Sequence, residues 1–406
     1  MDKKDKKRGR VFLQSLGCKT NQYENDALAA AFAAAGFSLV GAESTADVAV
    51  LNTCSVTAEA GRKSRQMLRR LKKRFPDALI VASGCHAQLS DLSELSDITV
   101  GTSGRDQIVE AVIQKLADRE AQGVILAEDP YAYETIAPVS LPSETRAYIK
   151  IEDGCDNRCS YCAIRLARGR VRSRSPESIE TEVLALAERG FTEFILTGTH
   201  IGAYGKGESF DFIGLLERLD QLAVGRIRLG SLEPKTISEA FMEKAASFRH
   251  VCPHIHLSLQ SGSDTVLRRM RRRYDSRRYK EAVERIFRVW PKAGLTTDVI
   301  VGFPGETDEE HKASVDFLSA LPFTDFHVFR FSPREGTEAY EMEGQVDPDV
   351  KRLRSREMEM LAAEKKRQAV IDRVGETRQL IVEKISDAVA YGYTEDYLYL
   401  AVDLSG

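Results

Sequence analysis

Three cysteines within eight residues near the middle of the chain constrain its fold and chemistry more than any other feature. Cys155, Cys159 and Cys162 follow the pattern C-x3-C-x2-C. A structural zinc site usually has four ligands, and an ordinary electron-transfer 4Fe-4S cluster has four cysteines. Three cysteines therefore favour a 4Fe-4S cluster with one iron that no side chain coordinates. The alternative is a zinc knuckle completed by a distant residue such as His254 or His256.

An iron without a protein ligand can bind a small molecule. The amino and carboxylate groups of S-adenosylmethionine (SAM) can chelate it, which places the sulfonium where an electron from the cluster can cleave a carbon–sulfur bond. The three cysteines also follow a predicted strand that begins near Ala147. Catalytic groups of α/β barrels lie on such strand-to-helix loops. Both observations favour the cluster over the zinc knuckle.

The other four cysteines are scattered along the chain. The total of seven is odd, and an intracellular chain keeps its thiols reduced, so a disulfide framework is not expected. Cys18, Cys54 and Cys85 each lie two or three residues beyond a predicted strand, at the edge where open parallel sheets bind ligands. The alternative is that these thiols pack as small hydrophobic side chains. We interpret Cys252, beside Pro253, as structural.

Residues 1–140 alternate short apolar runs with helical patterns, which predicts an α/β domain with a parallel sheet. The expected strands are 11–15, 48–51 and 78–82, and the expected helices are 24–35, 58–75 and 106–115. Between residues 117 and 142 the periodicity weakens and three prolines occur, which indicates a linker.

A second α/β domain is predicted for residues 141–374. Its strand-like runs begin near residues 147, 193, 226, 254, 297 and 325. Six βα units are too few for the complete eight-stranded barrel, so we expect an open, partial barrel. A charged helix is expected over 348–374. The runs 379–384 and 397–402 then predict a short β module in residues 375–406.

Composition excludes some classes of protein and leaves RNA binding to local charge. Apolar residues make up 43% and charged residues 29% of the chain, without a membrane-spanning stretch, so we expect a cytoplasmic protein with no membrane partner. The formal net charge is −3, so an RNA-binding face requires clustered arginines. Alternate arginines after the three cysteines could present one face to phosphates: Arg168, Arg170, Arg172 and Arg174. The alternative is a solvated face.

Several of these motifs resemble a known family. The cysteine spacing, the closing Tyr161-Cys162 pair and the six βα units are similar to the radical SAM superfamily. Residues 17–24 (GCKTNQYE), 52–57 (NTCSVT) and 84–88 (GCHAQ) resemble three blocks of the methylthiotransferase domain, and residues 168–174 (RGRVRSR) resemble the segment after the cluster. The first block looks most like the branch that modifies N6-threonylcarbamoyladenosine in tRNA.

The resemblance implies an activity and its cofactors. The chain is expected to add a methylthio group to C2 of N6-threonylcarbamoyladenosine 37 in the tRNA anticodon stem-loop, with SAM, two 4Fe-4S clusters and an electron donor such as flavodoxin or ferredoxin. The expected architecture is a methylthiotransferase domain, a partial (βα)6 radical SAM barrel and a partial TRAM-like RNA-binding barrel. The implied ligands of the second cluster are Cys18, Cys54 and Cys85.

The SAM contacts follow from resemblance and strand position together. Five residues in loops after the second, third and fourth strands of the second domain are expected to bind SAM: Thr197, Gly198, Ser231, Glu233 and Gln260. Each of these loops could equally be only a strand-to-helix turn. Three functional alternatives stay open: methylthiolation of a protein side chain, methylthiolation of isopentenyladenosine in tRNA, and a non-catalytic, metal-stabilised RNA-binding module.

Overall fold

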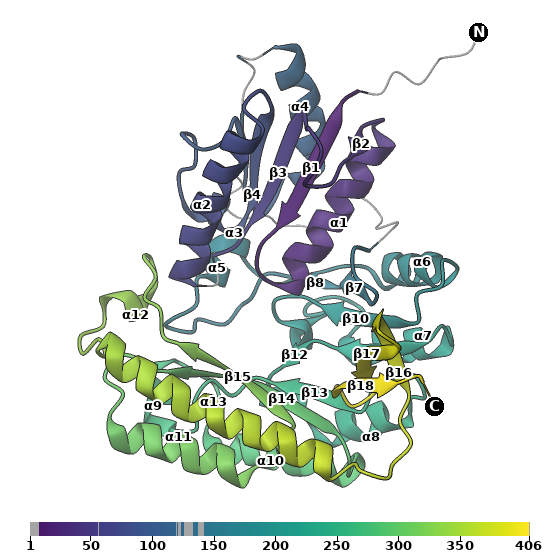
Figure 1. Cartoon of the computed structure of the whole chain (residues 1–406). Helices are drawn as coiled ribbons and strands as arrows, with labels where there is room; N and C mark the ends of the chain where they lie inside the picture. The colour runs from purple at the N-terminus through teal and green to yellow at the C-terminus, as the bar shows by residue number, and fades with distance from the viewer. Residues whose placement is uncertain are drawn as a thin grey trace. The chain divides into compact units, whose positions relative to one another are not determined.

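The computed structural model describes residues 8–55, 57–118, 120, 123–125, 133–136 and 142–405 (Figure 1). The chain divides into two compact units. Unit 1 is Met1–Glu144, Tyr148–Asn157 and Cys162–Leu186, and unit 2 is Thr145–Ala147, Arg158–Tyr161 and Ala187–Gly406. The expected domain boundary between residues 140 and 141, like most of the expected linker, lies outside the described residues.

Unit 1 is built on a six-stranded parallel sheet of order β2-β1-β3-β4-β5-β6. Its strands are β1 (Arg10–Ser15), β2 (Ser38–Leu39), β3 (Val48–Thr53), β4 (Leu79–Gly84), β5 (Ile98–Val100) and β6 (Val124–Ile125). Every residue of β3 and β4 is buried, which explains their nearly continuous apolar runs. The carboxyl ends of β1, β3 and β4 share one edge, since Ser15 pairs with Asn52, and Thr53 with Gly84.

Helices cover both faces of this sheet (Figure 1). α1 (Lys19–Ala34) and α4 (Ile108–Ala117) bury Phe32 and Val112 on one face. α2 (Ala58–Arg74) and α3 (Cys85–Leu89) bury Leu68 and Ala87 on the other. A fully buried Leu or Phe side chain contributes about 1.5–3 kcal/mol, so both layers hold the sheet edge in place. The expected strands and helices of this region are therefore present.

The remaining elements of unit 1 precede or follow the loop of three cysteines in the sequence. They are β7 (Ala147–Lys150), which begins in unit 2, then β8 (Glu152–Asp153), α5 (Ile164–Arg168), β9 (Arg172–Ser173) and α6 (Pro176–Ala187). β8 and β9 form an antiparallel pair in which Asp153 faces Arg172. The sequence did not predict this pair, because two-residue strands carry no periodicity.

Unit 2 contains the other five expected strands of the partial barrel and one further short strand, β12. The strands are β10 (Glu193–Thr197), β11 (Arg226–Leu229), β12 (Ser231–Leu232), β13 (His254–Leu257), β14 (Gly294–Val301) and β15 (Asp325–Arg330). β10 pairs with β11 in parallel. The strands β12, β13, β14 and β15 form a separate parallel sheet. An isolated bridge from Ile227 to Val251 links β11 to the residues just before β13. The parallel α/β fold is confirmed.

Helices alternate with these strands. They are α7 (Phe212–Gln221), α8 (Glu239–Ser247), α9 (Asp264–Arg269), α10 (Ser276–Val289), α11 (Asp308–Ala320), α12 (Glu338–Glu341) and α13 (Pro348–Ile371). Short 3-10 turns are η1 (Arg105–Gln107) in unit 1 and η2 (Ile201–Ala203) and η3 (Pro234–Thr236) in unit 2. The long helix α13 lies along β15 (Figure 1). Among the described residues, none of the helices is both long and apolar enough to span a membrane.

The C-terminal module is a three-stranded antiparallel sheet in unit 2. Its strands are β16 (Leu380–Ser386), β17 (Val389–Thr394) and β18 (Tyr399–Asp403). The expected runs correspond to β16 and β18, and β17 is an additional strand. Arg228 of β11 anchors the module, because its guanidinium donates to the carbonyls of Thr394 and Glu395, both at 3.0 Å, and lies 4.9 Å from the Tyr397 ring.

Candidate functional site

The three N-terminal cysteines lie at the carboxyl edge of the unit 1 sheet. Cys18 follows β1 and is the N-cap residue of α1, Cys54 directly follows β3, and Cys85 begins α3 directly after β4. Because these strands are neighbours in the sheet, residues far apart in sequence reach the same edge. Cys54 and Cys85 are each 2% exposed, whereas Cys18 is exposed.

Local contacts show that these thiols are close neighbours. Gly17 has φ +102°, and a Cβ atom at this position would collide with the Cys54 sulfur. Glycine is therefore required where the Cys18 loop meets Cys54. Burial raises the pKa of Cys85 to about 11; the nearby Arg168 charge opposes this rise, and the Cys18 and Cys54 thiols add to it.

The donor set of these three cysteines fits an iron-sulfur cluster. A 4Fe-4S cluster is held by several cysteine thiolates, each on a different iron. Cys18, Cys54 and Cys85 bring three thiols to one edge of the sheet, which suits such a cluster.

The second group of three cysteines occupies the loop between β8 and α5, and all three are partly buried. Gly154 sets the start of this loop: its φ is +85°, and a Cβ atom there would collide with the Arg170 carbonyl. The Cys155 N–H donates to the Gly169 carbonyl at 3.0 Å, and the Asn157 N–H points at the Cys155 sulfur at 3.4 Å. The sequence-predicted loop is thus shaped by its own backbone.

In unit 2, the middle of the same loop is fixed to the barrel. Ser160 donates its N–H to the Met270 carbonyl at 3.2 Å and its hydroxyl to the Arg269 carbonyl at 2.7 Å. Arg272 donates Nη1–H to the Cys159 sulfur at 3.2 Å and Nη2–H to Glu233 at 2.8 Å. One guanidinium therefore connects a predicted cluster ligand to a predicted SAM contact.

The predicted SAM contacts lie at the carboxyl ends of parallel strands or directly beyond them. Thr197 ends β10 and is buried, Gly198 follows it, and Ser231 is exposed on β12. Gln260 has φ +72°, and its N–H donates to the Asp298 carbonyl at 2.9 Å. Among the five predicted SAM contacts, Glu233 is connected to Cys159 by described hydrogen bonds, through Arg272.

The two histidines named as possible fourth zinc ligands have polar neighbours on β14. The His254 and His256 rings each share a hydrogen bond with the Thr296 hydroxyl, at 3.0 and 3.1 Å. His256 also lies 3.3 Å from the Asp298 carboxylate.

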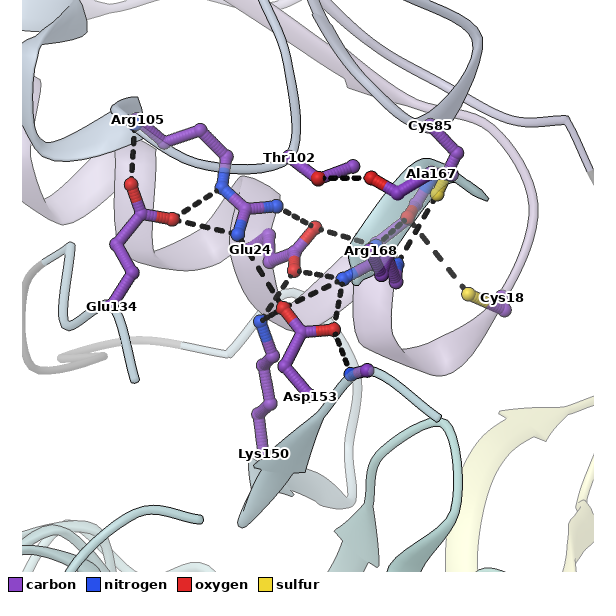
Figure 2. Close-up of polar contacts among 12 residues, drawn as sticks. Cys18, Glu24, Cys85, Thr102, Arg105, Glu134, Lys150, Asp153, Ala167 and Arg168 are labelled. Atoms are coloured by element: carbon purple, nitrogen blue, oxygen red, sulfur yellow. Dashed lines mark hydrogen bonds and ion pairs between the residues drawn. The ribbon is translucent and has the colours of Figure 1, made fainter. Parts of the chain in front are cut away.

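A buried network of charges adjoins the N-terminal cysteines (Figure 2). Glu24 of α1 is fully buried and pairs with Arg105, Lys150 and Arg168, each at 2.7 Å. Burial raises the pKa of Glu24, but the three cations outweigh it and hold this pKa well below its usual range. Asp153 behaves likewise, with Arg168 contributing the largest lowering of its pKa. Both carboxylates are therefore ionised at neutral pH.

Three of the four arginines predicted to bind RNA belong to the interior. Arg168, Arg172 and Arg174 are 1%, 7% and 4% exposed, and they pair with carboxylates including Asp153 and Glu182. These three side chains meet buried carboxylates instead of solvent. The prediction that these three arginines reach phosphates is corrected accordingly.

The fourth arginine of that prediction, Arg170, is exposed. It remains a candidate for RNA binding. Residues 268–278 are also rich in arginine. There Arg272 is directed at Cys159, whereas Arg268, Arg273 and Arg278 are exposed.

Sequence reasoning missed the functional environment of Arg168 and Arg272. Each of these side chains donates to a cysteine sulfur, at 3.2 Å in both cases. For Arg168 the sequence signal was an arginine run beside a cysteine motif, which is also the pattern of an RNA-binding face. Arg272 stands in an arginine-rich stretch that is 113 residues from Cys159. Their carboxylate partners Glu24 and Glu233 lie far away or in another loop, so the run alone could not assign them.

Two protein-family models match parts of the chain. Residues 149–318 match the radical SAM superfamily, and residues 10–101 match the uncharacterized protein family UPF0004. Among solved structures, the radical S-adenosylmethionine methyltransferase TsrM from Kitasatospora setae, solved with cobalamin and a [4Fe-4S] cluster, is similar with a TM-score of 0.60. It is 16% identical, and the match covers 82% of this chain and 77% of that chain. This likeness concerns the fold.

Curated relatives match along nearly the whole chain. The threonylcarbamoyladenosine tRNA methylthiotransferase MtaB of Bacillus subtilis is 36% identical over 96% of this chain and 89% of its own length. The protein of the same name from Thermotoga maritima is 34% identical over 96% and 90%. The tRNA-2-methylthio-N(6)-dimethylallyladenosine synthase of Bacillus subtilis is 31% identical over 95% and 79%.

Proposed function

The chain belongs to the radical SAM methylthiotransferase family, and from this premise we propose that it adds a methylthio group to C2 of N6-threonylcarbamoyladenosine 37 in tRNA. Enzymes of this family use SAM and 4Fe-4S clusters. The observation that carries the proposal is the pair of cysteine groups, three at one edge of a parallel sheet and three on one loop.

The relatives and the first sequence block favour threonylcarbamoyladenosine over its nearest alternative. Relatives named for threonylcarbamoyladenosine are 36%, 34% and 33% identical over nearly the whole chain, and residues 17–24 resemble that branch. Two relatives named for dimethylallyladenosine are 31% and 34% identical. Percent identity alone does not separate the groups, since both include relatives at 34%. The isopentenyladenosine substrate is therefore the second candidate.

Each group of cysteines is proposed to hold one cluster. When bound, the cluster of Cys155, Cys159 and Cys162 supplies the electron that cleaves SAM, and the cluster of Cys18, Cys54 and Cys85 presents sulfur for transfer. The chain itself orients these ligands. Gly154 shapes the first loop, Gly17 allows the Cys18 loop to approach Cys54, and Arg272 holds Cys159 beside Glu233.

The SAM pocket is proposed at the carboxyl ends of the barrel strands. Its polar groups are Thr197, Gly198, Ser231, Glu233 and Gln260. The Glu233 carboxylate is oriented by Arg272, and a carboxylate can accept hydrogen bonds from the amino or hydroxyl groups of SAM. A glycine at position 198 allows the backbone to approach the ligand closely.

The remaining proposals concern domains and partners. We propose a methylthiotransferase domain over 1–140, a radical SAM core over 141–374 and a partial TRAM-like module over 375–406. The substrate is the tRNA anticodon stem-loop, with the exposed Arg170 at its phosphates. The reaction takes place in the cytoplasm, and a one-electron donor such as flavodoxin or ferredoxin supplies the electrons.

Mass spectrometry of tRNA nucleosides tests the proposal. Cells that lack the protein should lose 2-methylthio-N6-threonylcarbamoyladenosine, keep methylthiolated isopentenyladenosine, and regain the lost nucleoside when the gene is restored. Loss of the isopentenyl form alone would establish the second candidate instead. An unchanged methylthio content in both nucleosides would exclude tRNA as the substrate and point to a protein side chain.

A further inference from the structure

Arg168 uses all of its N–H donors inside unit 1, and one of them is directed at sulfur (Figure 2). Nη1 donates to Glu24 at 2.7 Å and to Asp153 at 2.9 Å. Nη2 donates to Asn21 at 2.8 Å and to Glu24 at 3.1 Å. The single Nε–H donates to the Cys85 sulfur at 3.2 Å. A guanidinium has five donors in a fixed planar fork, so the four carboxylate and amide contacts determine where Nε points.

The same guanidinium reaches the surroundings of the other two cysteines through Asn21. The Asn21 side chain accepts from Arg168 and donates Nδ2–H to the carbonyls of Leu16 and Thr53, at 2.8 and 3.0 Å. Leu16 lies two residues before Cys18, and Thr53 directly precedes Cys54. Arg168 is therefore hydrogen-bonded, directly or through one side chain, to all three loops that carry N-terminal cysteines.

Burial makes this arrangement rigid. Arg168 is 1% exposed, Glu24 and Asn21 are each 0%, and Cys85 is 2%. A buried cation is retained only when its neighbours neutralise it, and here Glu24 and Asp153 do so. The charge beside Cys85 is thus held in place by carboxylates that do not touch the sulfur themselves.

We propose that Arg168 is a positioning residue for the N-terminal cluster, and that its Nε–H···Sγ hydrogen bond to Cys85 raises the reduction potential of that cluster. This inference rests on the proposed function, because it requires a cluster on Cys18, Cys54 and Cys85. It assigns to Arg168 a role in cluster chemistry in place of the RNA contact suggested by the sequence.

The direction of the effect follows from charge. Reduction adds one negative charge to the cluster, and a hydrogen bond from a cation to a ligand sulfur stabilises the more negative state. Removal of the donor therefore makes the cluster harder to reduce. Lysine would keep the charge, but its compact ammonium cannot reproduce the planar fork that directs one N–H at sulfur while two carboxylates are bound.

The test uses the full-length protein, reconstituted without oxygen, in its wild-type form and as Arg168→Lys and Arg168→Gln. Redox titration is followed by electron paramagnetic resonance. The signal that persists in a Cys155→Ala/Cys159→Ala/Cys162→Ala variant is assigned to the N-terminal cluster. We expect that signal to shift to lower potential in both arginine variants, by about 59 mV for each tenfold loss in the reduced-to-oxidised ratio of this one-electron couple.

Arg105→Lys is the matched control. Arg105 is also fully buried and pairs with Glu24 at 2.7 Å, but its described contacts are with carboxylates. The inference is supported if Arg168→Lys lowers the potential, or selectively loses the N-terminal cluster, while Arg105→Lys does neither. It is overturned if the cluster of the Arg168 variants titrates at the wild-type potential, or if Arg105→Lys has an equal effect.

A measurement on an unsubstituted Arg168 covers the case in which its variants do not fold. In the triple cysteine variant labelled with 15N-arginine, pulsed electron paramagnetic resonance should detect nitrogen coupled to the reduced N-terminal cluster. The absence of any coupled arginine nitrogen overturns the inference. If the wild-type chain holds no cluster on the N-terminal cysteines at all, the proposed function fails first, and iron analysis identifies that outcome separately.

Discussion

Replacement of Glu24 by glutamine tests the buried charge network that adjoins the N-terminal cysteines. Glutamine has nearly the same shape but no charge, so Arg105, Lys150 and Arg168 would lose a carboxylate that lies 2.7 Å from each of them. Glu24 is fully buried, so water cannot replace the lost charge. Breaking a buried ion pair by removing one partner costs about 3–5 kcal/mol, and we expect Glu24→Gln to destabilise unit 1 by this amount.

The destabilisation of unit 1 by Glu24→Gln should depend on pH in a defined direction. The pKa of Glu24 in the folded chain lies well below its ordinary value of 4.5 because three cations outweigh the effect of burial. A carboxylate with a lowered pKa stabilises the folded state above its unfolded pKa, and this contribution declines as the pH falls toward the folded pKa. The difference between wild type and Glu24→Gln should therefore stay constant from pH 7 to about 5 and shrink at lower pH.

Hydrogen exchange measured by mass spectrometry on the cluster-free chain gives the local magnitude. Amides of β3 and β4 should exchange about a hundredfold to several thousandfold faster in Glu24→Gln, as 3–5 kcal/mol implies at about 1.4 kcal/mol for each factor of ten. Glu217→Gln is the control, because Glu217 pairs with Lys244 at the same 2.7 Å but is 45% exposed. An exposed pair contributes about 0–1 kcal/mol. Equal effects of the two substitutions would refute the reasoning from burial.

Three further predictions concern the cysteine loops and the C-terminal sheet. Replacing Cys155, Cys159 and Cys162 together by alanine should abolish 5′-deoxyadenosine formation while about half of the iron remains; continued SAM cleavage would place the radical site elsewhere. Gly17→Ala should displace Cys54 and remove about half of the iron. Gly36→Ala is the control and should keep all of the iron, because Gly36 also has a positive φ (+88°) but an added Cβ atom would meet nothing within 4 Å. Equal iron contents in the two variants would contradict the steric argument. Arg228→Met should release the C-terminal sheet, because the hydrogen bonds from the Arg228 guanidinium to Glu193 and to the Thr394 carbonyl are lost. Limited proteolysis should then cut the chain near residue 375. Resistance equal to that of the wild type would count against this role of Arg228.

Much of the fold could be predicted because each buried strand is a short run of apolar residues that can be recognised in the sequence. The runs at Val48 and Leu79 are apolar throughout, since helices cover both faces of their sheet. Those strand ends also predicted that Cys54 and Cys85 would share an edge. The strand β17 was missed because Gly392 interrupts its pattern and its pairing depends on β16 and β18.

The roles of the arginines could not be predicted in the same way. A guanidinium has the same sequence signature whether it faces a phosphate or a buried carboxylate. Arg168 meets Glu24, which is 144 residues away in sequence, and only the folded sheet brings them together. Local spacing predicted one face for Arg168, Arg170, Arg172 and Arg174. In the structure Arg170 is exposed, whereas the other three are buried against carboxylates.

Iron, sulfide and zinc analysis of the protein purified without oxygen tests the central claim most directly. Two groups of three cysteines that each hold a 4Fe-4S cluster predict about eight iron and about eight sulfide ions per chain. They also predict that SAM perturbs the spectrum of one cluster, because a single iron of that cluster is open to it. About one or two zinc ions per chain with no sulfide would contradict the account.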